Sequence, residues 1–390
     1  MKKLKVLHLA SFIGNIGDNA NHKGVRRMFK RYLKYEMFYE EIEIRDYYIS
    51  WGKRFFNKDF IELVNKYDLL IIGGGNFFDL YIDKSVTGTT LNISNDILEK
   101  IKTPILFFGL GCDPYKGASE EILNKFRNFL KTLIKLGRSF ISVRNDGSIK
   151  NIKEYVGENF LDYIHHVPDG GFFTEIKDFN HPEVPENKNI IAVNVAGDMT
   201  DIRFELDAIG KDISYTKFIK ELAYTLNQLL EEDNNIDIVF VPHIFRDLKA
   251  ISEVLENLKD EYRRKRITVA PYLSGNKGHD YIFDIYKKAN LTVGMRFHTN
   301  VCSIGFNTPT IGFSTKHLKV RDLYEEVGLS DRILEVTKKG FGKALKKMIL
   351  ESLHKEKEIR ERYKNVVEQL QREMKLYCED LNQWLDKYFR

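Results

Sequence analysis

Two side chains that could bind an anion and transfer a proton follow an apolar strand pattern in VGMRFHTNVCSIGFNTPTIGF, residues 293–313. Arg296 offers a planar guanidinium that can hold a carboxylate or a phosphate through paired, charge-assisted hydrogen bonds. His298 offers an imidazole, which ordinarily titrates close to neutral pH. These residue types, two positions apart and directly after a strand pattern, indicate a site that binds an anion and moves a proton.

Further basic side chains follow other strand patterns in the same half of the chain. His243 ends the pattern IVFVPH, and Lys316 with His317 follows TIGF. Because ligands bind at the carboxyl ends of parallel strands in α/β sheets, these residues and Arg296 predict one cationic pocket. The alternative for His243 is a hydrogen-bonded structural histidine. The sequence shows no carboxylate–histidine cluster of the kind that holds a metal, so no metal is expected.

Loops rich in glycine and asparagine follow the strand patterns of the first half. GNIGDNANHKG begins at residue 14, GGGNFFD at 73 and RNDGS at 144. Loop glycines let backbone N–H groups approach an anion, so these loops predict one polar edge of a sheet. No dinucleotide fingerprint and no P-loop motif is present. The candidate residues in these loops and in the later VPDGG loop are Asn15, Gly17, Asp18, Gly74, Gly75, Asn76, Arg144 and Asp169.

Several of these candidates have structural alternatives, which the sequence leaves open, including helix capping for Asn76. Asp18 can serve as the N-cap of the helix that follows it. Arg144 can pair with Asp146, and Asp169 can open a turn. Asn76, which follows three glycines, is expected to line the ligand site.

The elements that must position these residues follow an alternating pattern. Apolar runs such as KVLHLA (5–10), DLLIIGGG (68–75) and PILFFGLGCD (104–113) alternate with amphipathic stretches. This alternation is typical of a parallel sheet covered by helices. EIEIRDYY (41–48) alternates like a further strand, and a helix is expected over about 21–35.

A polar segment at 180–189 separates two series of such units. We therefore predict an α/β protein with two Rossmann-like domains, whose parallel sheets face each other across a cleft, followed by a long C-terminal helix. The expected ranges are 1–180, 181–343 and 344–390. Apolar side chains of the last range share one helical face, so this helical segment is expected to pack back on the domains. A coiled-coil dimer is the alternative, and a homo-oligomer therefore stays open.

Composition narrows the classes of partner. The 390 residues carry a formal net charge of +5, which suits an anionic small molecule or a loose contact with a membrane surface. No basic stripe or recognition module points to nucleic acid. The three cysteines form no CxxC pair, which favours a reduced, cytoplasmic setting. No segment is apolar for long enough to span a bilayer.

The segment GMRFHTNVCSIGFNTPTIGFSTKH resembles the polysaccharide pyruvyl transferase family, in which a G-x-R-apolar-H sequence precedes a G-x-P stretch that ends in lysine. GNIGDNA is similar to the N-x-G-D-x-A loop of that family, and GGGNFF and GLGCDP are similar to its next glycine turns. SVRNDGS is similar to its S-x-R-D-x-x-S segment, with Asn145 where aspartate is more usual, and VPDGGF to a P-D-x-x-F stretch. The resemblance extends in order from about residue 8 to 330.

The resemblance implies a GT-B-like arrangement, with the acceptor on the first domain and the donor on the second. It implies transfer of the pyruvyl group of phosphoenolpyruvate to a saccharide, as a cyclic ketal, during synthesis of cell-envelope polysaccharide. No cofactor is expected, since phosphoenolpyruvate is a co-substrate. A lipid-linked acceptor at the inner face of the membrane would fit the aromatic-rich segment 28–56, whose alternative is an ordinary core helix and strand.

The resemblance implies that Arg296 and His298 contact phosphoenolpyruvate. His298 is expected to donate a proton or to bind the departing phosphate, while Asp18 or His243 deprotonates the acceptor hydroxyl. Two alternatives remain: a GT-B glycosyltransferase that uses a nucleotide sugar, and a non-catalytic binding relative. The expected donor-binding residues are Arg296, Phe297, Arg144 and Lys316.

Overall fold

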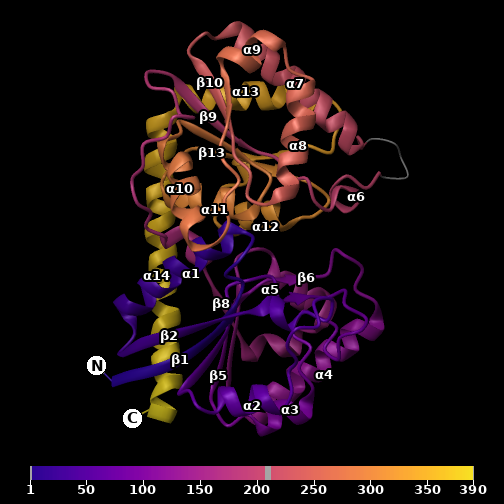
Figure 1. Ribbon diagram of the computed structural model, residues 1–390, viewed down its shortest axis with the longest axis vertical. Coiled ribbons are helices and arrows are strands. Elements are labelled where there is room, and N and C mark those ends of the chain that lie inside the picture. Colours follow the sequence, from indigo (N-terminus) through magenta and orange to yellow (C-terminus); the bar gives the residue numbers. More distant parts are fainter. Residues whose placement is uncertain (1, 207–211, 390) are drawn as a thin grey trace. The chain divides into compact units, whose positions relative to one another are not determined.

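The computed structural model describes residues 2–206 and 212–389 and divides the chain into two compact units (Figure 1). The first unit contains the chain up to Ile13, Gly24–Gly170 and the chain from Leu370 onward. The second unit contains Gly14–Lys23 and Gly171–Gln369. Residues 1, 207–211 and 390, which fall within the predicted domain ranges, lie outside the described residues.

Within the described residues, the first unit contains a six-stranded parallel sheet in the order β2-β1-β3-β5-β7-β8. The apolar runs of β3 and β5 are buried along their whole length, as expected of central strands covered on both faces. A short parallel pair, β4 with β6, lies outside this sheet. The strands are β1 Lys2–Ala10, β2 Tyr35–Glu43, β3 Leu69–Gly73, β4 Phe78–Asp79, β5 Ile105–Leu110, β6 Cys112–Asp113, β7 Ser139–Arg144 and β8 Ile164–Val167. The helices are α1 Ile16–Tyr32, α2 Lys58–Val64, α3 Asn95–Lys100, α4 Glu120–Leu136 and α5 Ser148–Asn151.

Two predicted element boundaries near the N-terminus are wrong. The strand expected at 41–48 ends at Glu43, because the Glu43 side chain accepts a hydrogen bond from the backbone N–H of Arg45 and caps a turn of 3-10 helix. Helix α1 begins at Ile16 rather than near residue 21. The Asn15 side chain accepts a hydrogen bond from the backbone N–H of Gly17 and starts this helix early.

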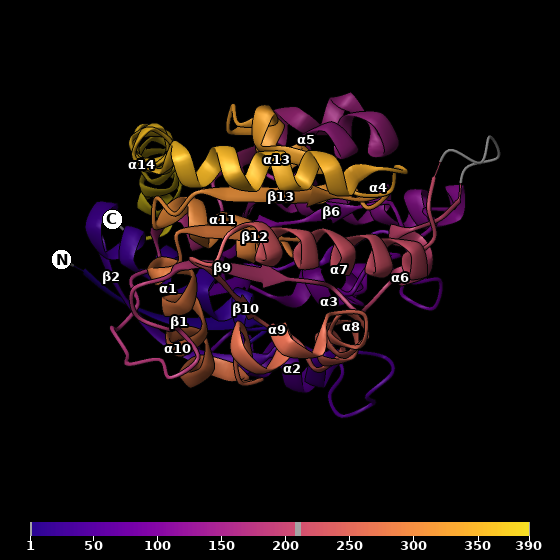
Figure 2. The same ribbon diagram turned by 90° about the horizontal axis from the view of Figure 1, so that it is seen from above.

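The described strands of the second unit form another six-stranded parallel sheet, in the order β11-β10-β9-β12-β13-β14. Figure 2 shows β13, β12, β9 and β10 following one another in that order. The strands are β9 Asn189–Asn194, β10 Ile236–Phe240, β11 Ile267–Val269, β12 Leu291–Gly294, β13 Thr310–Ser314 and β14 Ile333–Glu335. The helices are α6 Thr200–Arg203, α7 Tyr215–Glu232, α8 Phe245–Glu256, α9 Asp260–Lys265, α10 Gly275–Lys288, α11 Phe297–Gly305, α12 Lys319–Glu326 and α13 Phe341–His354.

Both faces of this second sheet are covered by helices. Along β9, Ile191 and Val193 contribute to a core shared with α7, α8 and α13. Ile190 and Ala192 point to the opposite face, into a core shared with α10 and α11. Ile16 at the start of α1 is buried in that second core, which explains why Gly14–Lys23 belongs to the second unit.

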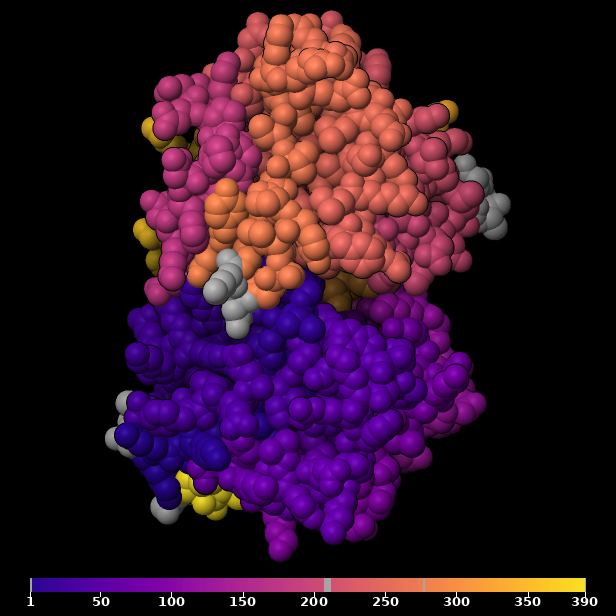
Figure 3. All heavy atoms as spheres, in the orientation of Figure 1, coloured from indigo at the N-terminus to yellow at the C-terminus, as the bar shows by residue number. Residues whose placement is uncertain are grey.

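The C-terminal range, for which a helical segment was predicted, forms two helices. Helix α13 ends at His354, and α14 extends over Glu356–Phe389. Residues of α14 up to Gln369 belong to the second unit, and its remaining residues belong to the first. Figure 3 shows yellow atoms of its last turns at the lower edge of the first unit. The buried apolar side chains of α14 are Ile359, Tyr363, Val367, Leu370, Met374, Tyr377, Cys378, Leu381, Trp384 and Leu385.

Two parallel, helix-covered sheets and a long C-terminal helix confirm the predicted fold class. Among the helices in the described residues, none is both long enough and apolar enough to cross a lipid bilayer.

Candidate functional site

The strand order of the second unit reverses between β9 and β12. The chain proceeds from β9 outward through β10 to β11, and then returns to place β12 on the other side of β9. Asn194 at the end of β9 pairs in register with Gly294 at the end of β12. Ligands of open α/β sheets bind outside the carboxyl ends of the strands at such a reversal. The residues after Asn194 and Gly294 therefore form the candidate site.

Arg296 lies at this reversal, as the N-cap residue of α11. Its backbone N–H donates to Asn194 Oδ1 at 3.0 Å, which ties the end of β12 to the end of β9. The Asn300 amide donates to the carbonyls of Arg296 and Gly294, at 2.8 and 3.1 Å. These bonds with two asparagine side chains fix the backbone of the turn between β12 and α11, and with it the position from which the Arg296 side chain extends.

Two carboxylates hold the guanidinium of Arg296, which is 10% exposed. Asp247 accepts from Nε at 2.7 Å and from Nη2 at 2.5 Å, and Asp198 accepts from Nη2 at 2.9 Å. Burial alone would raise the pKa of Asp247, but the charge of Arg296 outweighs it and holds that pKa below its ordinary value. Among the described residues, none accepts a hydrogen bond from Nη1 of Arg296.

His298 lies in the first turn of α11 and is buried. The ring of Phe297 contacts it edge-on, with ring centroids 5.2 Å apart. Gly17 of α1 packs against the same imidazole so closely that a Cβ at position 17 would lie 2.3 Å from His298 Nδ1. The structure therefore places Gly17 against the imidazole, with Asn15, whose side chain accepts from the Gly17 N–H, and half-buried Asp18 beside it in the chain.

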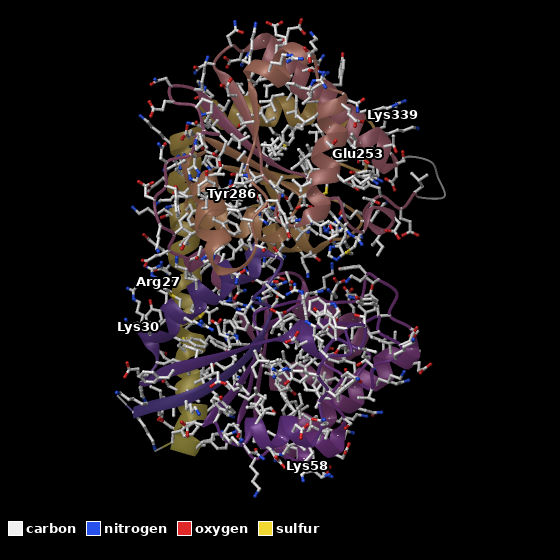
Figure 4. The ribbon with its side chains drawn as sticks, in the orientation of Figure 1. Arg27, Lys30, Lys58, Glu253, Tyr286 and Lys339 are labelled. Atoms are coloured by element: carbon white, nitrogen blue, oxygen red, sulfur yellow. The ribbon has the colours of Figure 1, made fainter. Side chains whose placement is uncertain are left out.

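His243 is buried beneath the site, and it follows β10. Its Nε2 lies 2.8 Å from the Tyr286 hydroxyl and 3.2 Å from Thr299 Oγ1. Figure 4 shows Tyr286 pointing among the side chains inside the second unit. Burial lowers the pKa of His243 to about 3, against the opposing effect of Asp247. This ring is therefore neutral at physiological pH and remote from solvent. These properties favour the alternative interpretation of His243 as a hydrogen-bonded structural histidine.

Lys316 follows β13 and is paired with a carboxylate rather than free. Its ammonium forms an ion pair with the buried Asp212, which also pairs with Lys338 at 2.5 Å. The backbone N–H of Lys316 donates to the carbonyl of Arg203 at 3.1 Å. Lys316 thereby lies beside α6, whose last residue is Arg203.

The remaining predicted residues belong to the first unit. Arg144 Nε donates to Asp146 at 2.8 Å and its Nη1 donates to Asp169 at 3.1 Å, with all three side chains buried. Asn76 donates to Asp113 at 3.2 Å. Arg144 is thus paired with Asp146, as its structural alternative predicted, and Asp169 is a second partner. Gly74 and Gly75 follow β3, where the backbone N–H of Gly74 donates to the Phe108 carbonyl at 2.9 Å.

Sequence reasoning missed the acidic partners of the site and one of its cations. Asp247 lies four positions after His243 at the start of a helix, a placement that could have marked it as a helix-capping residue. Asp198 and Arg203 occur in GDMTDIR, directly after the strand pattern of β9, where polar residues are expected to reach the site. Asp212 has no comparable local signal. In residues 2–206 and 212–389, no group of three or more His, Cys, Asp or Glu side chains is placed to hold a metal ion.

Comparison with known proteins identifies a family and agrees with the fold. The family model of polysaccharide pyruvyl transferases matches residues 15–317. UDP-GlcNAc 2-epimerase from Neisseria meningitidis bound to UDP-GlcNAc has a TM-score of 0.52 at 11% identity, over 93% of this chain and 94% of that one. HepE from Anabaena in complex with UDP and glucose has a TM-score of 0.54 at 10% identity, over 97% and 99%. No curated protein matches. These structures share the fold.

Proposed function

The chain belongs to the polysaccharide pyruvyl transferase family, and from this membership we propose that it transfers the pyruvyl group of phosphoenolpyruvate to a saccharide as a cyclic ketal. The observation that carries the proposal is the placement of Arg296 and His298 on one turn at the strand-order reversal, with Gly17 against the imidazole. The acceptor is a saccharide with two suitably spaced hydroxyl groups, carried on a lipid or free, and the reaction takes place in the cytoplasm.

Arg296 suits the anion of the donor. Phosphoenolpyruvate carries a carboxylate and a phosphate, and a guanidinium can hold either through paired hydrogen bonds. Asp247 keeps the Nε–Nη2 edge of Arg296 in place, so the guanidinium is oriented before a ligand arrives. This orientation reduces the side-chain entropy that binding must otherwise cost.

The proposed reaction has two hydroxyl additions. Protonation of the methylene carbon of phosphoenolpyruvate makes C2 electrophilic, and the first acceptor hydroxyl adds there. The C2–O bond to phosphate then breaks, and the second hydroxyl closes the ketal. One hydroxyl proton replaces the proton given to the methyl group, and the other leaves with inorganic phosphate.

His298 is the residue we assign to the proton delivered to carbon or to the departing phosphate. Asp18, half-buried in the first turn of α1, is the base we assign to the acceptor hydroxyl. His243 is not assigned a proton-transfer role, because burial lowers its pKa to about 3 and its Nε2 lies against Tyr286. A positioned acid or base contributes ~10²–10⁴-fold to a rate.

Phosphate release from phosphoenolpyruvate in the presence of saccharide acceptors tests this function. His298→Asn should lower that rate by ~10²-fold or more while thermal unfolding remains cooperative. Arg296→Lys should raise KM for phosphoenolpyruvate, because a lysine cannot reproduce the paired hydrogen bonds. Arg263→Lys, on the exposed helix α9, is the matched control and should behave like the wild type.

Thermal unfolding in the presence of each ligand, measured beside phosphate release, distinguishes the alternatives left open by the sequence. Stabilisation against heat by UDP, without any effect of phosphoenolpyruvate, would favour a nucleotide-sugar transferase. Binding of phosphoenolpyruvate without turnover on any acceptor would favour a non-catalytic relative. Full activity of His298→Asn would contradict the role assigned to His298.

A further inference from the structure

A single carboxylate lies between two nearly buried guanidinium groups at the candidate site. Asp198 Oδ1 is 2.9 Å from Nη2 of Arg296 and 3.6 Å from Nη2 of Arg203. The two arginine side chains are 10% and 9% exposed, respectively. Because both guanidinium groups face the same carboxylate oxygen, an anion that replaced this carboxylate would lie against both of them.

The two carboxylates that contact Arg296 are held very differently. Asp247 is fully buried and also accepts from the backbone N–H groups of His243, Ile244 and Gly197, at 2.9, 3.2 and 3.2 Å. The Asp198 carboxylate is 22% exposed, and among the described residues its contacts are the two guanidinium groups. Asp247 is thus a permanent partner of the site, whereas Asp198 can exchange with solvent.

The backbone that carries Asp198 is held on one side and strained on the other. At Gly197 a Cβ would lie 2.0 Å from the carbonyl oxygen of Arg246, so this residue is packed closely against the start of α8. Met199, on the other side, has φ 53° and ψ 34°, a left-handed conformation that is unfavourable for a residue with a side chain.

The charges around the site leave room for an anion in place of Asp198. Each of the other two carboxylates is bonded to at least one cation, Asp247 to Arg296 and Asp212 to both Lys316 and Lys338. Removal of Asp198 from the guanidinium groups leaves the cluster with an excess of positive charge in a poorly solvated place. A dianion such as a phosphoryl group would neutralise it. The charged residues of the cluster are Arg203, Arg296, Lys316, Lys338, Asp198, Asp212 and Asp247.

We infer that Arg203 and Arg296 form a paired binding site for the phosphoryl group of the donor, and that Asp198 occupies this site until the ligand displaces it. The identity of the donor rests on the proposed function, but the anion site itself does not. Arg203 is then a second donor-binding cation, supplied by the segment after β9, and Asp198 sets the concentration of anion needed to open the site.

Binding of inorganic phosphate tests this inference without turnover. Isothermal titration with phosphate, at an ionic strength kept constant with chloride, compares the wild type with Asp198→Asn and Arg203→Met. If Asp198 occupies the site for ~90% of the time or more, its neutralisation should tighten phosphate binding by about tenfold or more. Arg203→Met should weaken phosphate binding, and Arg203→Lys, which keeps a charge without the planar fork, should weaken it less. Asp201→Asn, an exposed carboxylate on the same helix α6, is the control and should bind phosphate like the wild type.

Unchanged or weaker phosphate binding by Asp198→Asn would overturn the inference, as would wild-type binding by both Arg203 variants. The titrations are then repeated with phosphoenolpyruvate and with UDP. The donor is the ligand that binds more tightly to Asp198→Asn than to the wild type, because its phosphoryl group replaces the carboxylate. If phosphate behaves as expected but no acceptor supports phosphate release, the proposed reaction fails and the anion site stands. If the protein transfers pyruvyl groups but Asp198→Asn has the phosphate affinity of the wild type, the proposed reaction stands and the anion site fails.

Discussion

Acidification should destabilise the second unit through His243, whose imidazole is buried in it. Burial lowers the pKa of His243 to about 3, against the opposing effect of Asp247. In an unfolded chain a histidine has a pKa of ~6.5. Between these two values the unfolded state binds more protons than the folded state, so the free energy of unfolding decreases as the pH falls.

The structure sets the size of this effect. At pH 5 an unfolded histidine is almost fully protonated, while the folded ring stays neutral. The free energy of unfolding is therefore about 2 kcal/mol lower than at pH 7, at ~1.36 kcal/mol for each pH unit below ~6.5. The physical cause lies in the contacts of the ring. Its Nε2 is engaged by Tyr286 and Thr299, and its Nδ1 has no hydrogen-bond partner among the described residues. A second ring proton would therefore place an unsatisfied cation in the core.

Urea unfolding at pH 7 and pH 5, followed by far-UV circular dichroism, measures the effect. The loss of stability between the two pH values should be smaller in His243→Gln than in the wild type by about 2 kcal/mol. His354→Gln, which removes an exposed histidine at the end of α13, should retain the wild-type loss. An identical loss in His243→Gln and the wild type would refute the reasoning. So would a ring signal of His243 that titrates between pH 7 and pH 5 in NMR spectra of the folded protein.

Three substitutions test other parts of the structure. Gly17→Ala should lower phosphate release by ~10²-fold with the fold retained, because its Cβ would displace His298; steady-state kinetics and circular dichroism report the two quantities. Tyr363→Phe should lower the free energy of unfolding by about 1 kcal/mol, because it removes the hydroxyl 3.0 Å from Thr310 Oγ1. Arg144→Met should lower it by ~3–5 kcal/mol, because it leaves two buried carboxylates without their cation; urea unfolding measures both losses.

Each of these substitutions has a matched control on the same chain. Gly52→Ala adds a methyl group where no atom lies within 4 Å, so it should leave the rate of phosphate release unchanged; because φ is 60° at this position, it costs some stability, which circular dichroism measures. Tyr388→Phe removes an exposed hydroxyl of α14, and Lys153→Met removes an exposed ion pair with Glu158, so both should change stability less than their buried counterparts. Equal losses in a variant and its control would contradict the contact assigned to that residue.

Strand existence was predictable where the apolar pattern was continuous, and element boundaries were less so. The runs that became β3, β5 and β9 are buried throughout or nearly so, because both faces of a central parallel strand are covered. The predicted range of the edge strand β2 was wrong. Its end is decided by one side chain, Glu43, which accepts hydrogen bonds from the backbone of the following turn and of Phe12 and Ile13. Hydrophobic pattern carries no information on such a contact.

The site was partly predictable for the same kind of reason. Arg296, His298 and Lys316 follow strand patterns, and a residue after a parallel strand reaches one edge of the sheet whatever its distant partners are. The burial of His243 and the pairing of Arg144 depend on how neighbouring elements pack over them. A strand-end position alone does not distinguish an exposed basic side chain from one already paired.

The sequence by itself determined the fold class, the family and the positions of Arg296 and His298, because these follow from local periodicity and from residues a few positions apart. Only the tertiary structure decided the electrostatic state of the site. It placed Asp198 and Asp247 on Arg296 from positions 98 and 49 residues away along the chain, and it packed Gly17 against His298. Such pairings depend on distances between elements that meet only in the folded chain, and these distances determine which cation is available to a ligand.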